Sequence, residues 1–353
     1  MTAPLPLDPS DPAPAGTLVS AFGGRYYRIT HADALPTFFM NVVSSSDLWL
    51  FLASNGGLTA GRGDSDRALF TYQTVDRIYD SAGVNGPLTA CWVGTAGGPV
   101  LWEPFARRTA AHAGIARHLY KSIEGDRVWF EEINAPLGLA FRYGWSTSEE
   151  HGFVRRCELE NLTDQPRDVR VLDGLRNVLP AGIPLRLQSA SSCLADAYKT
   201  AERLPDTSLA VFALSAGIVD RAMPLESLTA TVVCSEGLPG AVTLLSDRQL
   251  GSFLAGGTPA PETHGRGLRT SYFLAAPLRL LPRAAERWLL VADIGLSQAA
   301  VAARRRDLAH GGFGARVTAA ADESTRRLRQ WVGAADGLQA GGDETVTAHH
   351  LRH

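Results

Sequence analysis

Residues 153–178 read FVRRCELENLTDQPRDVRVLDGLRNV, and this stretch decides the class of fold. In both halves, apolar or β-branched residues are interspersed with charged ones, which is the period-two pattern of a strand with two different faces. Between the halves stand residues that favour turns: Asn161, Thr163, Asp164 and Pro166. The stretch therefore predicts a β-hairpin, with one arm on each side of the turn.

The same pattern extends outward in both directions. From about residue 17 to 295, short β-branched or aromatic runs alternate with Gly, Pro, Asn and Asp at intervals of eight to twelve residues. Further strands are predicted at residues 127–133, 137–145, 209–214, 228–234, 243–245, 268–280 and 287–292. One short helix is predicted at residues 195–203. The fold class expected is mainly β, a large antiparallel β super-sandwich.

The character of the sequence changes past Ser297. Residues 298–308 and 315–332 are rich in Ala and Arg and predict two helices, with Ser297 as the N-cap of the first. We expect a disordered tail at residues 1–16, the sandwich at 17–295, and C-terminal linker helices at 296–353. Residues 345–353 begin like a helix and stop, so the chain looks cut short there.

Composition excludes several classes of protein. The 353 residues carry 34 Lys plus Arg against 36 Asp plus Glu, without the basic excess of a nucleic-acid binder. The four cysteines lie far apart, form no CxxC motif and read as buried free thiols. The N-terminus lacks the features of a secretory signal, and no apolar run reaches the ~18 residues of a membrane span. We expect a cytoplasmic protein with no membrane, nucleic-acid or cofactor partner.

A Gly-rich segment, residues 54–80, supplies the first candidate binding site. It has neither phosphate-loop nor dinucleotide-binding spacing. Sugars are held by planar polar side chains beside an aromatic face, and the candidate contacts of this kind are Arg62, Asp64, Tyr72, Asp76 and Arg77. A long hairpin whose acidic and basic residues form salt bridges is the alternative. A second candidate set follows the 153–178 turn: Asp173, Arg176 and Asn177.

No catalytic or metal motif stands out. There is no GxSxG elbow and no HExxH, and His349 with His353 lack an obvious third ligand. His112 and His118 could serve as general bases, although hydrogen-bonded histidines would look the same. Glu131 and Glu132 are adjacent, so in a strand they face opposite sides and do not form one acid/base site. We therefore nominate no catalytic residue and no metal ligand.

The order of these features resembles a known family. A Gly-rich segment opening SNGG at Ser54, the stretch 154–180 and the Ala-rich helices resemble the N-terminal super-sandwich of cellobiose-phosphorylase-like enzymes and related inverting glycosidases. The phrase ENLTD at 160–164, followed by Arg170 and Val171, is similar to a hairpin of that domain. The resemblance extends over about residues 20–350.

The resemblance implies a division of labour. In that family the sandwich packs against a following (α/α)6 barrel, linker helices connect the two, and the barrel carries the general acid. It implies that this chain binds carbohydrate or acts as a scaffold for a barrel in cis or in trans, without catalysis of its own. The sandwich also resembles galactose mutarotase, but its His and Glu find no matching positions here. A stand-alone aldose-epimerase-like enzyme and a scaffold for a separate helical partner remain the alternatives.

Overall fold

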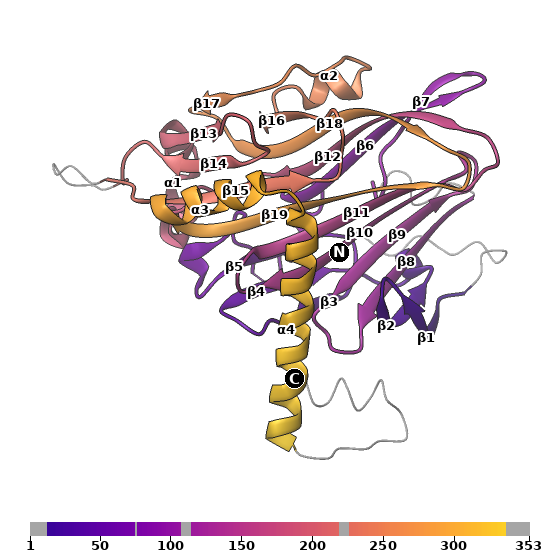
Figure 1. Cartoon of the computed structure of the whole chain (residues 1–353), viewed down its shortest axis with the longest axis horizontal. Helices are drawn as coiled ribbons and strands as arrows, with labels where there is room; N and C mark the ends of the chain where they lie inside the picture. The colour runs from indigo at the N-terminus through magenta and orange to yellow at the C-terminus, as the bar shows by residue number, and fades with distance from the viewer. Residues whose placement is uncertain (1–12, 75, 107–113, 219–225, 337–353) are drawn as a thin grey trace.

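Antiparallel strands dominate the molecule. The computed structural model describes residues 13–74, 76–106, 114–218 and 226–336, and these form three antiparallel sheets with a few helices (Figure 1). The mainly-β class with C-terminal helices is therefore confirmed. Strand β1 begins at Ala15, just inside the expected tail, and residues 1–12 lie outside the described residues.

Within the described residues, two large sheets form the layers of the sandwich. The larger has the order β1 (Ala15–Ala21), β2 (Gly24–Thr30), β8 (Ile115–Ser122), β9 (Val128–Asn134), β10 (Leu139–Ser148), β11 (Gly152–Asn161), β19 (Ala285–Ser297), β15 (Thr229–Glu236), β14 (Ala210–Leu214), β13 (Lys199–Arg203) and β17 (His264–Arg266). The second has the order β16 (Val242–Ser246), β18 (Thr270–Leu280), β12 (Arg167–Arg176), β6 (Gly86–Thr95) and β7 (Gly98–Trp102). A small sheet joins β3 (Phe39–Val42), β4 (Leu48–Ala53) and β5 (Leu58–Arg62).

The predicted hairpin at 153–178 is wrong in its pairing, although both of its strands exist. Strand β11 pairs with β10 and β19 in the larger sheet, whereas β12 pairs with β6 and β18 in the second. The turn is an arch that carries the chain from one sheet to the other. Asn161 holds it by donating from Nδ2 to the carbonyl oxygens of Gln165 and Leu281, at 2.7 and 3.1 Å.

The main core lies between the two sheets. It includes Phe141 and Trp145 of β10, Phe153 of β11, Leu175 of β12 and Tyr272 of β18. Burying apolar area of this kind is the dominant stabilising contribution to such a fold. Three cysteines are buried free thiols, as predicted, namely Cys91, Cys157 and Cys234; the side chain of Cys193 lies outside the described residues.

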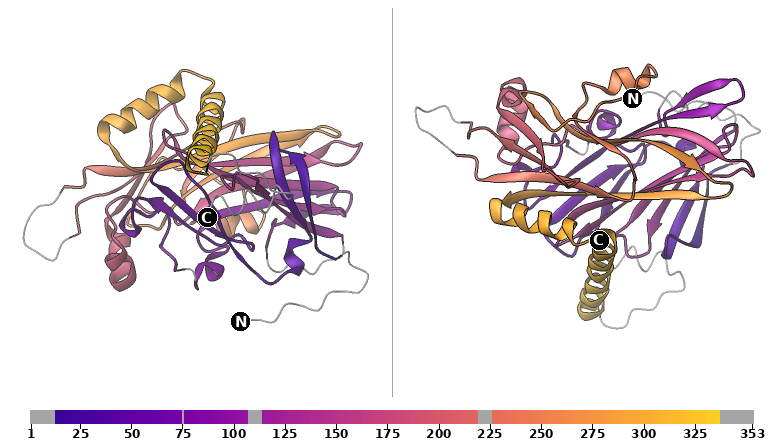
Figure 2. Two further views of the ribbon diagram at one scale, coloured as in Figure 1. Left: turned by 90° about the horizontal axis from the view of Figure 1, so that it is seen from below. Right: turned by 45° about the horizontal axis from the view of Figure 1, so that its top comes forward.

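Helices cover the outer faces of the sandwich. Helix α2 (Leu250–Leu254) packs Leu250 and Phe253 on the second sheet, whereas α3 (Gln298–Ala309) and α4 (Phe313–Asp336) lie against the larger one. Figure 2 shows α2 and the α3–α4 pair on opposite sides of the sandwich. Short 3₁₀ turns complete the described structure at η1 (Ala32–Ala34), η2 (Ser65–Arg67) and η3 (Ile78–Ser81). No helix in the described part of the chain is long and apolar enough to cross a membrane.

The two C-terminal helices lie where they were predicted, whereas the short helix predicted at 195–203 does not. Both C-terminal helices are confirmed, and Ser297 Oγ caps α3 by accepting from the Ala300 N–H at 3.3 Å. The helix predicted at 195–203 is misplaced: α1 spans Leu185–Tyr198 and shares only residues 195–198 with the prediction, whereas Lys199–Arg203 is strand β13. Pairing with β14 and β17 outweighs helix propensity in that segment. Residues 345–353, with His349 and His353, lie outside the described residues.

A buried histidine lies where the C-terminal helices meet the sandwich. His151, in the turn between β10 and β11, is 1% exposed, and neither ring nitrogen has a hydrogen-bond partner. Its ring meets Phe313 edge-on, with centroids 5.6 Å apart. Arg304 of α3 donates to the carbonyl oxygen of Glu150 at 2.8 Å and so clamps the same turn. The junction therefore encloses a neutral imidazole.

Acid is expected to weaken this junction. Burial first, and then the positive charge of Arg304, lower the pKa of His151, although Glu150, Asp307 of α3 and Asp293 of β19 oppose the shift. Since the unfolded chain binds the proton first, stability is fully present above the ordinary histidine pKa of about 6.5 and falls as the pH drops below it. Urea unfolding between pH 7.5 and 5 should therefore show a shallower loss of stability in His151→Leu than in the parent.

Two comparisons make this measurement specific. Burial also lowers the pKa of His118, so part of the pH slope should remain in His151→Leu. His264→Leu, a change at an exposed histidine outside the junction, is the matched comparison. If the free energy of unfolding changes equally with pH in the parent and in His151→Leu, then His151 does not cause the loss of stability in acid.

Candidate functional site

The Gly-rich segment places its first two candidate side chains at the end of β5, where each already has a partner. Arg62 donates from Nη1 to Asp47 at 2.8 Å and from Nη2 to Asp293 at 3.1 Å, which ties β5 to β19. The Asp64 carboxylate caps η2 by accepting from the Asp66 N–H at 3.0 Å. Both therefore have local structural roles.

The remaining three candidates follow further along the loop. The Tyr72 ring meets Trp49 edge-on at 5.9 Å, and its backbone N–H donates to Gln188 of α1 at 2.8 Å. Asp76 and Arg77 are exposed, and a hydrogen bond from Thr74 lowers the pKa of Asp76. Among the described residues, no hydrogen bond or salt bridge links any two of the five candidate side chains. Their role in sugar binding stays a prediction.

Asp173 belongs to the core. It is 0% exposed and forms a two-bond ion pair with Arg155, with Nη1–Oδ2 at 2.7 Å and Nη2–Oδ1 at 2.9 Å. Thr89 and Trp288 also donate to it, at 2.6 and 2.7 Å. Burial by itself would lower the pKa of Arg155, but Asp173 holds it above its ordinary value. With every neighbour supplied by the chain and no exposed surface, Asp173 has no access to a sugar.

Arg176 and Asn177 fix a loop beside the second sheet. Arg176 donates to Asp247 at 2.8 Å and to the Gly83 carbonyl oxygen at 3.1 Å. Asn177 adopts φ of +55°, in the left-handed region that asparagine tolerates, and donates to the Val84 carbonyl oxygen at 2.8 Å. Both side chains are partly exposed, so their contact with a ligand stays a prediction.

The paired glutamates of β9 face opposite sides, as predicted. Glu132 points into the sandwich and accepts from Trp102 Nε1 at 2.7 Å and Arg117 Nε at 2.8 Å. Glu131 points outward and accepts from the Tyr120 hydroxyl at 2.6 Å and Arg142 Nε at 2.5 Å. Each carboxylate is thus paired with its own arginine.

His118 lies next to Glu131 across the β8–β9 ladder and is the described candidate base. Its Nδ1 accepts from the backbone N–H of His31 at 3.2 Å. The neutral ring must therefore carry its proton on Nε2, where it can donate but not accept. This tautomer does not suit a general base that works through Nε2. His112, the other histidine considered, lies outside the described residues.

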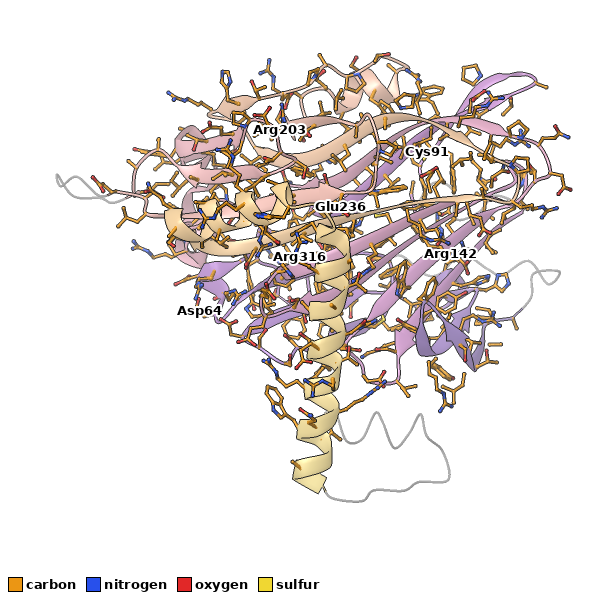
Figure 3. All side chains as sticks on the ribbon, viewed as in Figure 1. Asp64, Cys91, Arg142, Arg203, Glu236 and Arg316 are labelled. Atoms are coloured by element: carbon orange, nitrogen blue, oxygen red, sulfur yellow. The ribbon has the colours of Figure 1, made fainter. Side chains whose placement is uncertain are left out.

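A groove between strands of the two large sheets escaped the sequence analysis. It holds about 460 Å³, and both sheets line it: Arg203 of β13, Ser235 and Glu236 of β15, Thr243 of β16 and Leu274 of β18, with Ser208, Leu238 and Ala241 from the connecting segments. Figure 3 labels Arg203 and Glu236. These residues come from distant segments, so no local motif signals the site. The turn residue Gly237, with φ of +102° and no room for a Cβ beside Arg287, is its one local sign.

Comparison with known proteins gives likenesses of architecture. No family model and no curated protein matches the chain. A bacterial glucoamylase complexed with acarbose is 9% identical, with a TM-score of 0.49 over 85% of this chain and 39% of its own. A putative kojibiose phosphorylase from the human microbiome is 8% identical, with a TM-score of 0.32 over 87% of this chain and 31% of its own.

The match to a third solved structure extends over nearly the whole length of that protein. The putative aldose 1-epimerase of Klebsiella pneumoniae is 10% identical, with a TM-score of 0.34 over 84% of this chain and 96% of its own. The chain thus spans less than two fifths of the glucoamylase and the phosphorylase but nearly all of the epimerase. All three are carbohydrate enzymes, and at these identities and scores the likeness is one of architecture alone.

Proposed function

We propose that this chain is the sandwich domain of a carbohydrate-active enzyme, and that it binds carbohydrate and supports an (α/α)6 barrel that carries the glycoside chemistry. The sandwich with two C-terminal helices is the arrangement that the sequence resemblance implies for such a domain. The observation that carries the proposal is the course of α4, which is anchored as far as Arg329 and then runs past the edge of the larger sheet (Figure 1).

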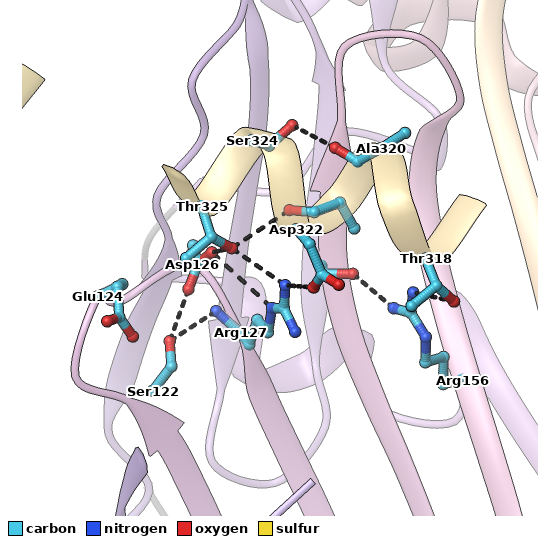
Figure 4. Close-up of polar contacts among 12 residues, drawn as sticks. Ser122, Glu124, Asp126, Arg127, Arg156, Thr318, Ala320, Asp322, Ser324 and Thr325 are labelled. Atoms are coloured by element: carbon cyan, nitrogen blue, oxygen red, sulfur yellow. Dashed lines mark hydrogen bonds and ion pairs between the residues drawn. The ribbon is translucent and has the colours of Figure 1, made fainter. Parts of the chain in front are cut away.

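The anchored part of α4 is held by both apolar and polar contacts. Phe313 and Val317 are fully buried in a cluster with Val154 of β11. Arg127 donates to Asp322 at 2.6 Å and to Thr325 at 3.0 Å, as Figure 4 shows. These contacts fix the direction of the helix relative to the sheet.

The distal part of α4 has a different surface. The helix has 24 residues, which corresponds to about 36 Å at the ordinary rise. Past Arg329, which donates to Glu124 at 2.6 Å, the side chains are mostly exposed, and the Trp331 side chain is 53% exposed. A large exposed aromatic residue on a rigid projecting helix is typical of a surface that packs against another body. This supports a helical partner at that end.

The carboxylates support a division of labour between this chain and the barrel. Glu131 and Glu132 are each paired with arginine, and Asp173 is enclosed in the core. Since a general acid must reach the glycosidic oxygen, and these three carboxylates are buried and already bonded within the chain, none of them suits the task. We therefore assign no turnover to this chain alone.

The purified chain is expected to show no catalysis in two assays. Incubated with α- and β-linked glucose disaccharides, with and without phosphate, it should release sugar or sugar phosphate no faster than buffer does. It should also leave the mutarotation of α-glucose at its spontaneous rate. Accelerated mutarotation that His118→Ala abolishes would instead support the epimerase alternative.

The coding sequence past codon 353 separates the remaining possibilities. An open frame that encodes an (α/α)6 barrel, whose joined product cleaves or phosphorolyses a glycoside while the present chain does not, would support the barrel in cis. A stop codon beside a separate gene for such a barrel, with activity only when the two chains are mixed, would support the barrel in trans. Turnover by the present chain alone would overturn the proposal.

A further inference from the structure

The groove between the two large sheets has the size of a small-molecule site. Its volume of about 460 Å³ falls within the ~300–1,000 Å³ of typical ligand pockets. Leu238 and Leu274 are among its apolar lining residues, and Ser235 and Thr243 are among its polar ones. The chemistry of the groove depends on which of the lining side chains point into it, and the strand pairing settles this for the residues on strands.

The Arg203 side chain faces the space between the two sheets. Arg203 lies opposite Ala210 in the β13–β14 ladder, and residues directly opposite each other point to the same face of a sheet. Ala210 belongs to the main core between the sheets, as does Ala201, which lies two residues before Arg203 on β13. The strand therefore directs the guanidinium into the groove that Arg203 lines.

Two hydroxyl residues of the groove face the same space. Ser235 lies opposite Leu290 in the β15–β19 ladder, and Thr243 lies opposite Leu274 in the β16–β18 ladder. Both leucines belong to the main core, so both hydroxyl side chains are on the inner faces of their sheets. Arg203, Ser235 and Thr243 thus come from three strands of two sheets and point toward one another's side.

A hydrogen-bond network leaves an acceptor free on this wall. The Tyr272 hydroxyl donates to the Ser208 carbonyl oxygen at 2.8 Å and lies 2.8 Å from Ser235 Oγ. Because Tyr272 has one hydroxyl proton, Ser235 is the donor in their mutual bond. Ser235 Oγ therefore keeps lone pairs that can accept a hydrogen bond from a ligand hydroxyl.

The acidic residue that borders the groove points away from it. Glu236 follows Ser235 directly and lies opposite Leu289 in the β15–β19 ladder, so its side chain is on the other face of the larger sheet. On that face its Oε2 accepts from the Gly314 N–H of α4 at 3.1 Å. Among the described residues that line the groove, Arg203 is therefore the one whose ionised side chain faces it.

Arg203 is held in place with bonding capacity to spare. Its Nη1 donates to the Thr207 carbonyl oxygen at 3.0 Å, and the guanidinium has four further N–H donors. Within the described part of the chain, no carboxylate lies within ion-pair distance of it. A guanidinium matches a planar carboxylate with two parallel hydrogen bonds, and its single charge balances that of a carboxylate. A phosphate monoester carries about −1.5 to −2 at neutral pH, which one arginine does not balance.

We infer that this groove binds a sugar that carries one carboxylate, such as a uronate unit. The carboxylate accepts hydrogen bonds from Arg203, a sugar hydroxyl donates to Ser235 Oγ, and the apolar face of the ring packs on the leucines of the groove. The choice of a sugar among hydroxylated carboxylates rests on the function proposed above, whereas the choice of the charge rests on the orientation of Arg203.

Isothermal titration calorimetry of the present chain tests this site with glucuronate, glucose and acetate. Glucose lacks the carboxylate and acetate lacks the sugar ring, so each of these two probes removes one half of the recognition. We expect glucuronate to bind at least tenfold more tightly than either of them, about 1.4 kcal/mol. Glucose 6-phosphate, whose charge one guanidinium does not balance, should bind more weakly than glucuronate.

Three variants locate the binding. Arg203→Gln removes the charge and keeps an amide that can donate to the Thr207 carbonyl oxygen, so it should weaken glucuronate binding at least tenfold at an unchanged thermal midpoint. Arg203→Lys keeps the charge without the planar fork and should retain part of the affinity. Glu236→Gln changes a charge on the outer face and keeps an acceptor for the Gly314 N–H, so its affinity for glucuronate should match that of the parent.

Four results would overturn the inference: glucuronate binding no tighter than that of glucose, or no tighter than that of acetate, tighter binding of glucose 6-phosphate, or glucuronate binding that survives in Arg203→Gln. Glycoside turnover by the chain joined to a barrel, without glucuronate binding by the chain, would overturn the groove and leave the proposed function standing. Glucuronate binding that depends on Arg203, in a chain that gains no turnover from a barrel, would establish the site and overturn the proposed function.

Discussion

Replacing Asp173 by asparagine is expected to lower the free energy of unfolding by about 3–5 kcal/mol, the cost of breaking a buried ion pair from one side. Arg155 is 0% exposed, so the substitution leaves a guanidinium charge unpaired inside the sandwich. Asparagine is nearly isosteric, and the loss therefore reports the charge more than the volume. Urea unfolding followed by far-ultraviolet circular dichroism measures it.

The position of the pair explains why the effect should reach the whole fold. Arg155 is on β11 of the larger sheet and Asp173 is on β12 of the second, so their two hydrogen bonds cross the sandwich. Trp288 of β19 donates to the same carboxylate, and the Arg155 guanidinium lies 4.9 Å from the centroid of the Tyr143 ring. The substitution thus disturbs several strands at once.

Two comparisons isolate the buried charge. Arg279→Ala breaks an ion pair with Asp168 whose side chains are 65% and 71% exposed, and it should cost no more than about 0.5 kcal/mol. The double variant Arg155→Met/Asp173→Leu removes both charges and should recover most of the stability lost in Asp173→Asn. A loss below about 1 kcal/mol in Asp173→Asn would show that the pair is not a cross-sheet clamp.

This ion pair also shows what the sequence could and could not predict. The alternation at 153–178 predicted two strands, and both exist at nearly the expected residues. Alternation shows only that a strand has two different faces. Two strands that face each other across a sandwich therefore have the same sequence pattern as two strands that pair within one sheet. Because Phe253 of α2 packs against Leu172 of β12, part of the face expected to be exposed is also covered.

Helices were predicted well where local signals sufficed. A capping serine and a period of three to four residues marked α3 and α4, and both lie where expected. At residues 199–203 the strand depends on β14 and β17, which lie elsewhere in the chain, so propensity alone led to a helix. The groove has the same origin, since Arg203, Glu236 and Thr243 meet only through the pairing of distant strands.

Phe313→Ala is expected to weaken the docking of α3 and α4 by about 3–5 kcal/mol, the usual cost of truncating a buried phenylalanine. The side chain is 0% exposed and packs with Val317 and Val154, and its ring also covers His151. The cavity would open at the first turn of α4, between the helices and the larger sheet. Hydrogen exchange followed by mass spectrometry should show faster exchange over residues 298–329.

The matched change on the same helix is Trp331→Ala. Trp331 is 53% exposed and lies beyond Arg329, which bonds Glu124 of the sandwich, so this change should cost the isolated chain no more than about 0.5 kcal/mol. In the proposed assembly with a barrel, the same change should weaken packing between the two, because a tryptophan at an interface commonly contributes more than 2 kcal/mol. Equal increases of hydrogen exchange in Phe313→Ala and Trp331→Ala, measured on the isolated chain, would contradict the assignment of only Phe313 to docking on the sandwich. Phe313 therefore tests how the sandwich holds the helix, and Trp331 tests the contact of the helix with the proposed barrel.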